Sequence, residues 1–415
     1  MSFTIEIITT GDELMTGLTA DGNFFWAGDL LASRGLEIAY HTTVGDYMDR
    51  IVDAFGIARG RADAVIVSGG LGPTADDLTA EAAGRFFGAG LELNKEALAS
   101  IEERYKRRGR VMTDINRKQA CLPKGCTVLI NEWGTAPGWR SESEGAVFYF
   151  LPGVPKEFRA MMGAYVLPEL EKTATGRPAA RTRLIKTFGL PESGVAERLA
   201  GLEMEGVRLG YRAHFPEVHL RATAYAGTEN DAEALLDDYT DEVTARLAGY
   251  VFSTNGETME EALGILLKER SLTLATAESC TGGLISHRVT NVPGSSAYFL
   301  EGVVSYSNEA KEKILGVPHE TLVEHGAVSG PVVEAMARGV RQLSGSDIGV
   351  AVSGIAGPGG GTLEKPVGTV YIGTDSASHG ARSERFLFFG TREDIKLATS
   401  SRAIMTVMQI LLNNV

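Results

Sequence analysis

The stretch "TLATAESCTGGLISHRV" (273–289) places a serine, a cysteine and paired glycines where an apolar strand pattern gives way to an amphipathic helix pattern. Ser279 at such a corner is placed as nucleophiles often are, with backbone amides near Thr281, Gly282 and Gly283 to hold an oxyanion. The alternative is that Ser279 or Thr281 only caps the helix. Taken alone, the stretch favours capping, so the assignment of a nucleophile depends on partners elsewhere.

Cys280 is the rival nucleophile, because a thiolate is intrinsically more reactive than a hydroxyl. A catalytic cysteine needs a base, but His287 lies about two turns along the predicted helix and His325 falls in a predicted loop. We therefore predict a small, packed thiol at Cys280. A serine without a His/Asp set needs another base, and a partly buried lysine with a lowered pKa can serve.

Residues further along the chain complete this candidate site. Lys311 follows a strand pattern in "VVSYSNEAKEKILG" and supplies the base, with Tyr306 as an orienting group. "DIGVAVSGIAGPGGG" is a buried strand ending in a glycine-rich loop, which suits ribose or phosphate at Gly354 and Gly357. Arg392 opens a predicted helix in "FFGTRED" and suits a phosphate anion.

A second set of candidate residues lies in "VIVSGGLGPTADDLTAEAAG", whose pattern predicts a strand, a glycine-rich turn and a helix opened by Thr74. Amides in such a turn approach a ligand closely, and the helix N-terminus adds positive field for phosphate. Asp76 and Asp77 either hold a divalent cation against that phosphate or only stabilise the first helical turn. The predicted phosphate contacts are Gly69, Gly70, Gly72 and Thr74.

Acidic residues also follow the first predicted strand. Asp12 and Glu13 in "TTGDEL" lie at its carboxyl end, the edge where open α/β sheets bind ligands. With the two aspartates after the glycine-rich turn, they would form an acidic metal site. "NRKQACLP" and "NEWGTAPGW" add polar residues and a Gly/Pro-rich turn, each a weak signal when taken singly. Their predicted substrate contacts are Asn116 and Lys118.

Positioning these residues requires sheets whose strands end at a common edge. From residue 3 to about 168, short apolar runs alternate with helical patterns, which predicts βαβ units in a doubly wound, mostly parallel sheet. A small, polar and basic connector (171–183) leads into a strand-helix-strand-strand-helix pattern. We predict an α/β chain of three parts, which are an N-terminal domain (1–170), a small α+β middle domain (171–252) and a C-terminal α/β domain (253–415).

Length, charge and cysteine content limit the kinds of partner and the compartment that the chain can have. It has 415 residues, enough for two or three domains, and a formal net charge of −13, which disfavours direct contact with nucleic acid. No apolar stretch approaches the roughly 18 residues of a membrane span, and no secretion signal is evident at the start. Three cysteines (121, 126 and 280) lack paired metal spacing, which predicts reduced thiols in the cytoplasm.

Five motifs of the first part resemble a known family. "GDELMTG", "SGGLGPTADDLT", "NRKQACLP", "GTAPGW" and "LPGVPKEF", in this order, resemble the CinA family (competence/damage-inducible protein A) and its domain related to molybdenum-cofactor biosynthesis enzymes. The resemblance implies a metal-dependent pyrophosphatase that splits ADP-ribose into AMP and ribose 5-phosphate. It implies a divalent ion (Mg, Mn or Co) near Asp76 and Asp77, with potassium as a further ion. Where many members read closer to "GTE", this chain has "TTGDE", which leaves the role of Asp12 open.

The last part resembles the CinA carboxyl-terminal domain, which is similar to nicotinamide-nucleotide amidase. The motifs are "AESCTGG", "GSSAYFLEGVVSYSNEAK", "HGAVS", "SGIAGPGGG", "KPVGTV" and "GTRED". The resemblance implies that Ser279 attacks the carboxamide carbon of nicotinamide mononucleotide, while Lys311 accepts its proton and later helps ammonia leave. Amides near 280–283 would stabilise the tetrahedral oxygen, and the site would need no cofactor.

Together the resemblances predict a cytoplasmic, bifunctional enzyme of pyridine-nucleotide salvage, because both substrates are breakdown products of NAD. Symmetric association is the default for such enzymes, so a homodimer is expected. A different class of function stays open: a nucleotide-sensing or scaffold protein linked to competence, with one or both sites binding without turnover. A third possibility is that the first domain handles a pterin nucleotide.

Overall fold

The computed structural model describes residues 3–176 and 178–413. The chain divides into two compact units, formed by residues 1–182 with 224–233 and by residues 183–223 with 234–415. Within the described ranges, the strands form three larger sheets and one two-stranded ladder. Each larger sheet is described separately below.

The N-terminal sheet has six strands in the order β2-β1-β3-β8-β7-β6. Its first four strands run parallel, and β7 and β6 extend it in antiparallel fashion. Both β1 and β3 are buried along their whole length, which explains the apolar run of β3; β1 also buries Glu6, which pairs with Arg61. The bounds are β1 (Ile5–Thr10), β2 (Ile38–Val44), β3 (Ala64–Ser68), β6 (Thr127–Leu129), β7 (Gly138–Ser143) and β8 (Ala146–Leu151).

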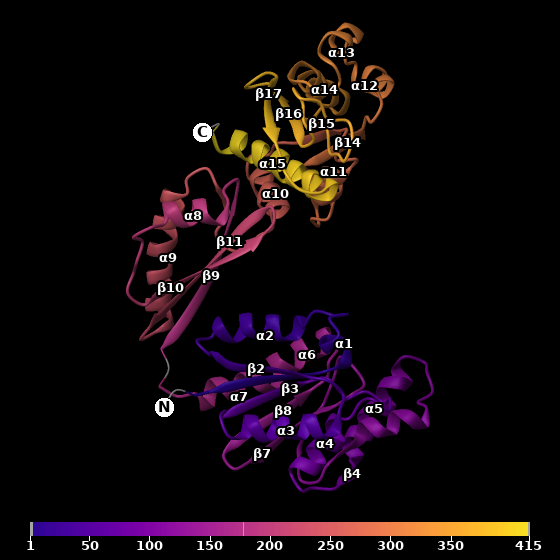
Figure 1. The fold of residues 1–415 in the computed structure, drawn as a ribbon, viewed down its shortest axis with the longest axis vertical. Helices are drawn as coiled ribbons and strands as arrows, with labels where there is room; N and C mark the ends of the chain where they lie inside the picture. Colours follow the sequence, from indigo (N-terminus) through magenta and orange to yellow (C-terminus); the bar gives the residue numbers. More distant parts are fainter. Residues whose placement is uncertain (1–2, 177, 414–415) are drawn as a thin grey trace. The chain divides into compact units, whose positions relative to one another are not determined.

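Helices cover both faces of this sheet, as predicted for a doubly wound domain. Apolar residues of α2, α6 and α7 form one core against the sheet, and those of α3, α4 and α5 form another. Figure 1 shows α2 and α6 on one side of the strands and α3 and α4 on the other. The bounds are α1 (Asp12–Met15), α2 (Gly22–Ala32), α3 (Met48–Arg59), α4 (Thr79–Phe86), α5 (Lys95–Arg107), α6 (Pro155–Met161) and α7 (Leu167–Thr173). Short elements complete the domain: β4 (Leu91–Leu93), β5 (Cys121–Pro123), a 3-10 segment η1 (Asp114–Ala120) and a π-helical segment η2 (Met162–Val166).

The middle sheet has the order β10-β11-β9-β12 and carries two helices. The chain order β9, α8, β10, β11, α9 is the predicted strand-helix-strand-strand-helix sequence, and β12 adds a further strand. Alternate residues Val218, Leu220 and Ala222 of β11 are buried. The bounds are β9 (Ala179–Phe188), α8 (Glu192–Arg198), β10 (Val207–His214), β11 (Glu217–Ala226), α9 (Glu229–Arg246) and β12 (Val251–Ser253).

The C-terminal sheet has the order β14-β13-β15-β16-β17, with three parallel strands followed by two antiparallel ones. One core includes residues of α10, α11 and α15, and a second core includes residues of α12, α13 and α14. The strands are β13 (Leu274–Glu278), β14 (Phe299–Val304), β15 (Ile348–Gly354), β16 (Thr369–Ser376) and β17 (Arg382–Leu387). The helices are α10 (Met259–Glu269), α11 (Leu284–Thr290), a 3-10 turn η3 (Ser295–Ala297), α12 (Asn308–Leu315), α13 (His319–His325), α14 (Gly330–Ser344) and α15 (Arg392–Asn413).

In the N-terminal sheet and in the C-terminal sheet, the first strand in chain order lies between the two strands that follow it in the sequence. The chain leaves β1 for β2 on one side and returns to β3 on the other, and β13 is flanked in the same way by β14 and β15. The strand order therefore reverses beside β1 and beside β13. Ligands of open α/β sheets bind at the carboxyl ends of strands at such a reversal.

Helix α15 is long and apolar enough to raise the question of a membrane span, although charged residues such as Lys396 and Arg402 interrupt its apolar stretches. By length and composition, residues Arg392–Leu412 could cross a membrane. However, 61% of the most apolar window is buried inside the protein. Residues such as Ile395, Ile404 and Leu411 belong to the core beneath the C-terminal sheet, which accounts for the apolar character of the helix.

Candidate functional site

The turn that carries Ser279 connects β13 to α11. The N-cap of α11 is Gly283, which has a left-handed backbone (φ 95°) and makes no side-chain cap hydrogen bond. Gly282 is also left-handed (φ 65°), so the two glycines suit a turn that other residues would strain. Neither Ser279 nor Thr281 is the N-cap of α11, so the capping role considered for these two residues is excluded.

The buried carboxylate of Glu278 caps α11 instead. Its Oε2 accepts hydrogen bonds from Thr281 Oγ1 (2.6 Å), Gly283 N (3.0 Å) and Ile285 N (3.1 Å). Its Oε1 accepts from Ser286 N (2.8 Å) and Ser286 Oγ (2.7 Å). Sequence reasoning missed this residue, because a glutamate at a strand end gives no sign that helix amides converge on it. Through these hydrogen bonds Glu278 holds the Ser279 turn against the first turn of α11.

Lys311 comes into contact with Ser279 from α12. Lys311 Nζ donates to Ser279 Oγ (3.2 Å) and to Ser305 O (2.8 Å). The lysine is 1% exposed and the serine 9% exposed. Burial lowers the pKa of Lys311, because the charged ammonium loses its hydration. A buried amine with a lowered pKa, bonded to a hydroxyl, is equipped to take the proton of that hydroxyl.

Three other predicted residues meet near this pair. Arg392, the first residue of α15, donates from Nη1 to Gly357 O (2.7 Å) and from Nη2 to Tyr306 Oη (3.3 Å). Lys311 Nζ also donates to the carbonyl of Tyr306 (3.4 Å). The Tyr306 side chain is exposed, so its hydroxyl is accessible to a ligand. Gly354 ends β15, where a Cβ atom would lie 2.9 Å from Thr369 O, so its need for glycine comes from strand packing.

The rival nucleophile, Cys280, lies in the core. Its side chain is buried, and burial raises the pKa of the thiol to about 12. The reactive thiolate is therefore scarce near neutral pH. His287 contacts Asn291 on its own helix (3.3 Å), and His325 is the last residue of α13 rather than a loop residue. The structure gives Cys280 the packed role that its sequence context predicts.

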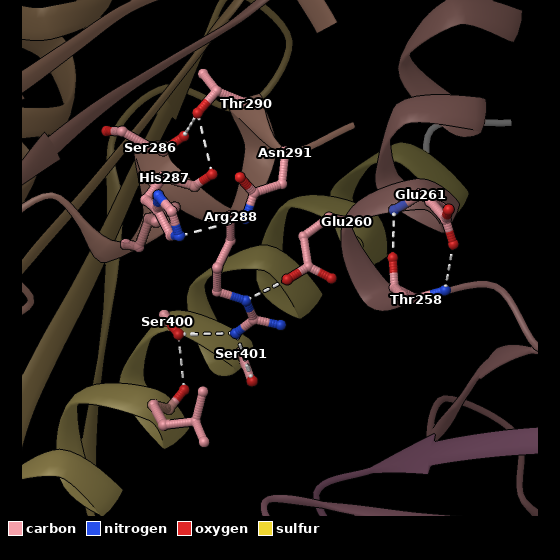
Figure 2. A network of polar contacts seen from close by, with 12 residues as sticks. Thr258, Glu260, Glu261, Ser286, His287, Arg288, Thr290, Asn291, Ser400 and Ser401 are labelled. Carbon is pink, nitrogen blue, oxygen red and sulfur yellow. Dashed lines mark hydrogen bonds and ion pairs between the residues drawn. The ribbon is translucent and has the colours of Figure 1, made fainter. Parts of the chain in front are cut away.

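Helix α11 is held in place by Arg288, as Figure 2 shows. Its Nη1 donates to Ser400 Oγ (2.7 Å) and Ser401 Oγ (2.8 Å) of α15, and its Nε pairs with Glu260 of α10. Glu260 follows Thr258, which begins α10 with a reciprocal capping box. The helix that follows the Ser279 turn is thus bonded to two neighbouring helices.

The N-terminal domain has a cavity of about 430 Å³ at the carboxyl ends of β1, β3 and β8. Six residues predicted to bind substrate or metal line this cavity. Three further acidic or amide side chains, which were not predicted as site residues, line it as well. The predicted lining residues are Glu13, Gly69, Gly70, Gly72, Asp76 and Asp77, and the additional ones are Asp46, Gln119 and Glu157.

The glycine-rich turn packs tightly against the end of β1. Gly69 and Gly70 both have left-handed backbones (φ 110° and 65°). A Cβ atom at Gly70 would lie 2.2 Å from Thr79 Oγ1, and one at Gly69 would lie 2.5 Å from Thr10 O. Only glycine fits these two positions, because the turn packs directly against Thr79 and the end of β1. The predicted phosphate contacts of these glycines stay a prediction.

Helix α4 begins at Thr79, five residues later than the prediction that Thr74 opens it. The cause is a turn closed by Asp77, whose Oδ2 accepts from Thr74 N (2.9 Å) and Thr74 Oγ1 (2.5 Å). Lys118 Nζ secures the same turn by donating to Thr74 O and Asp77 O, each at 2.8 Å. Thr74, Asp77 and Lys118 therefore hold the loop, and Asp76 lies exposed beside the cavity.

Acidic side chains gather at this cavity. Asp12 and Asp46 bond reciprocally, with Asp46 N donating to Asp12 Oδ1 (3.1 Å) and Asp12 N donating to Asp46 Oδ2 (3.0 Å). Burial raises the pKa of Asp46, and the negative charges of Asp12, Glu13 and Asp76 raise it further. Carboxylates are the ligands that hard divalent cations such as Mg²⁺ or Mn²⁺ prefer. However, Asp12, a predicted ligand, is not among the lining residues, and within the described residues no three of these carboxylates offer ligand atoms within 4.8 Å of one another.

Asn116 lies outside the described lining of the cavity. Its Oδ1 accepts from Tyr105 Oη (3.0 Å), and its Nδ2 donates to Thr113 Oγ1 (2.6 Å). The side chain therefore joins α5 to η1. A substrate contact at Asn116 has no support from this placement.

Comparison with protein families assigns all three parts of the chain. Residues 6–172 match the model described as "Probable molybdopterin binding domain". Residues 182–253 match the "Damage-inducible protein CinA KH domain", and residues 256–411 match the "CinA C-terminal domain". The order and extent of the matches agree with the family that the sequence motifs resemble.

Relatives match over nearly the full length. The CinA-like protein of Citrifermentans bemidjiense is 46% identical over 98% of this chain and 97% of its own. The CinA-like protein of Geotalea uraniireducens is 42% identical over 96% of each chain. Among solved structures, competence/damage inducible protein CihA from Agrobacterium tumefaciens is 39% identical, covering 38% of this chain and 99% of its own, with a TM-score of 0.36. The full-length relatives establish that the chain belongs to the CinA family.

Proposed function

We propose that the C-terminal domain hydrolyses the carboxamide of nicotinamide mononucleotide, giving nicotinate mononucleotide and ammonia. The observation that carries this proposal is the contact between the buried Lys311 Nζ and Ser279 Oγ, at 3.2 Å. A lysine with a lowered pKa beside a serine hydroxyl forms a nucleophile-base pair that requires no histidine.

In the proposed reaction, Ser279 Oγ attacks the carboxamide carbon while its proton passes to Lys311 Nζ. The ammonium of Lys311 then protonates the amide nitrogen, the carbon–nitrogen bond breaks, and ammonia leaves an ester on Ser279. Water next attacks the ester and gives a proton to Lys311, which returns it to Ser279 Oγ as the acid is released.

The turn limits which amides can stabilise the tetrahedral oxygen. Gly282 N donates to Ser279 O (3.2 Å), and Gly283 N donates to Glu278. The proposal therefore assigns the oxyanion contacts to the amides of Cys280 and Thr281 rather than to the whole 280–283 stretch. Arg392, whose guanidinium contacts Tyr306 and Gly357, is the proposed ligand of the substrate phosphate.

A second function is proposed for the N-terminal domain, hydrolysis of ADP-ribose to AMP and ribose 5-phosphate. The specific observation in its favour is the cavity where the glycine-rich turn faces carboxylates. Glu13, Asp46 and Asp76 would hold the divalent ion, which when bound neutralises diphosphate charge and activates water. The chain itself contributes the backbone cradle at Gly69 and Gly70, which orients the diphosphate.

The first test measures ammonia release from nicotinamide mononucleotide by the full chain, with a chelator present throughout. Wild type is compared with Ser279→Ala and Lys311→Met, and Lys313→Met serves as the matched control because Lys313 is exposed on the same helix. We expect metal-independent release that both site variants abolish and the control retains. Release that survives in Ser279→Ala would refute the serine mechanism.

The second test measures AMP release from ADP-ribose with Mg²⁺, Mn²⁺ or Co²⁺, in wild type and Asp76→Asn. Metal-dependent AMP release that the variant loses supports the pyrophosphatase. Tight ADP-ribose binding with no AMP release would instead favour a nucleotide sensor. Stronger competition by pterin nucleotides than by other diphosphates would favour the third possibility.

A further inference from the structure

The middle domain, which has no role in either proposed reaction, carries a cluster of metal-ligating side chains. His214 is the last residue of β10, and Glu217 and His219 lie at the start of β11. One ligand atom from each lies within 4.8 Å of the other two. Among the residues that the structure describes, no other His/Cys/Asp/Glu group meets this criterion.

The hairpin explains why these residues converge. Only Phe215 and Pro216 separate the two strands, so His214 and Glu217 face each other across the end of the hairpin. His219 follows Glu217 by two residues and therefore projects from the same face of β11. The imidazole rings of His214 and His219 stack with centroids 4.6 Å apart and planes 12° from parallel.

One pair of polar atoms in the cluster is already in contact. His219 Nε2 lies 2.7 Å from Glu217 Oε2, which places an imidazole nitrogen and a carboxylate oxygen around a shared proton. A divalent cation can replace that proton, because neutral imidazole and carboxylate are both metal ligands. The ligand atoms in a tetrahedral zinc site lie about 3.4 Å apart, from zinc–nitrogen distances near 2.1 Å. The three candidate ligand atoms lie within 4.8 Å of one another, so side-chain rotation must bring them to that spacing.

Burial is graded across the cluster in a way that suits an ion entering from solvent. His219 is buried, Glu217 is half-buried and His214 is exposed. Burial thus restrains His219, whereas the exposed His214 side chain can be reached from solvent. Two imidazoles and one carboxylate are the ligands of several zinc sites with a vacant fourth position, and imidazole disfavours Mg²⁺ and Ca²⁺.

We propose that His214, Glu217 and His219 form a binding site for a borderline divalent metal ion of the zinc type. Its three protein ligands leave a fourth position for water or another small ligand. The site is chemically distinct from the all-carboxylate set of the N-terminal cavity, which favours harder ions.

The test measures Zn²⁺ bound per full-length chain after metal removal, reloading and dialysis at pH 7.5, by elemental analysis. The key variant is His214→Gln/His219→Gln, and the matched control is His287→Gln/His325→Gln, which removes two histidines of the C-terminal domain. Asp46→Asn/Asp76→Asn removes carboxylates of the N-terminal cavity. We expect the key variant to bind one Zn²⁺ fewer than wild type, while the other two variants keep that ion.

Co²⁺ substitution provides a second readout. A low-coordinate site with two imidazoles gives a stronger visible absorption than a carboxylate site, so the intense band should disappear only in the key variant. Circular dichroism confirms that this variant remains folded. Equal Zn²⁺ content and an unchanged Co²⁺ spectrum in wild type and the key variant would overturn the proposal, leaving the cluster as a hydrogen-bonded pair beside a stacked ring.

Discussion

Ser286 presents both its amide and its hydroxyl to the same carboxylate oxygen of Glu278, at 2.8 and 2.7 Å. The other oxygen of Glu278 binds Thr281 and two further amides. A fully buried carboxylate that accepts this many hydrogen bonds leaves few of the converging donors unpaired. The geometry of the Ser279 turn therefore depends on a neighbour that has no part in the proposed chemistry.

Glu278→Gln should destabilise the protein by about 3 kcal/mol, because an amide group replaces an acceptor among converging N–H donors. Amidase activity should fall with it, since the Ser279 turn loses its support. Urea unfolding and ammonia release measure the two effects. Glu320→Gln, an exposed substitution on α13, should change neither. Wild-type stability in Glu278→Gln would contradict the capping role.

The pH dependence of the proposed amidase should follow Lys311. The neutral amine is the active form, so the rate rises with pH through the lowered pKa of Lys311 and levels off above it. Because burial lowers this pKa, the plateau is reached at a lower pH than an ordinary lysine would allow. A profile of kcat/KM against pH measures the midpoint. A rate that falls as pH rises through this range would exclude Lys311 as the base.

Cys280→Ala should retain amidase activity. The thiol is buried with a pKa of about 12, so it contributes packing and no nucleophile. Loss of its sulfur should cost about 1 kcal/mol of stability, as for a small core truncation. Parallel ammonia-release and unfolding measurements on Cys280→Ala and Ser279→Ala separate the two residues. The nucleophile would have to be reassigned if the alanine at 280 abolished turnover and the one at 279 did not.

Two adjacent aspartates should behave differently when each is changed to asparagine. Asp76→Asn should raise the metal concentration needed for ADP-ribose hydrolysis by more than about tenfold, as loss of a metal contact does. Asp77→Asn replaces the charged acceptor of Thr74 N and Oγ1 with a neutral amide, which weakens both hydrogen bonds, so it should loosen the loop and speed its limited proteolysis. Asp53→Asn, on the exposed side of α3, is the control for both. Identical metal profiles for the variants at 76 and 77 would contradict this division.

Arg392→Gln should act on substrate binding more than on chemistry. Loss of one charged hydrogen bond to a phosphate is worth about 2 kcal/mol, or roughly 30-fold in KM. The turnover number should change much less, because the Ser279–Lys311 pair is untouched. Arg385→Gln, an exposed arginine on β17, is the control. A large fall in kcat with unchanged KM would assign Arg392 to another step.

Much of this architecture could be predicted, because unbroken apolar strands and glycine-rich turns are local signals. The alternation of strands and helices placed both turns at the ends of parallel strands, and the pairing of Lys311 with Ser279 matches the interpretation of their motifs. Glu278 was missed because its partners are amides that converge only after the turn has folded. The start of α4 was misplaced because the Asp77 side chain closes a turn where the sequence shows a good helix opening.

The two strand-order reversals lie in sheets with separate apolar cores, one set in each compact unit. When such a chain is heated, its two compact units need not unfold at the same temperature. Each of the two proposed activities should have its own inactivation temperature, and calorimetry should resolve more than one transition. A preparation that passes an assay for one reaction is therefore no guarantee that the other half of the chain is intact.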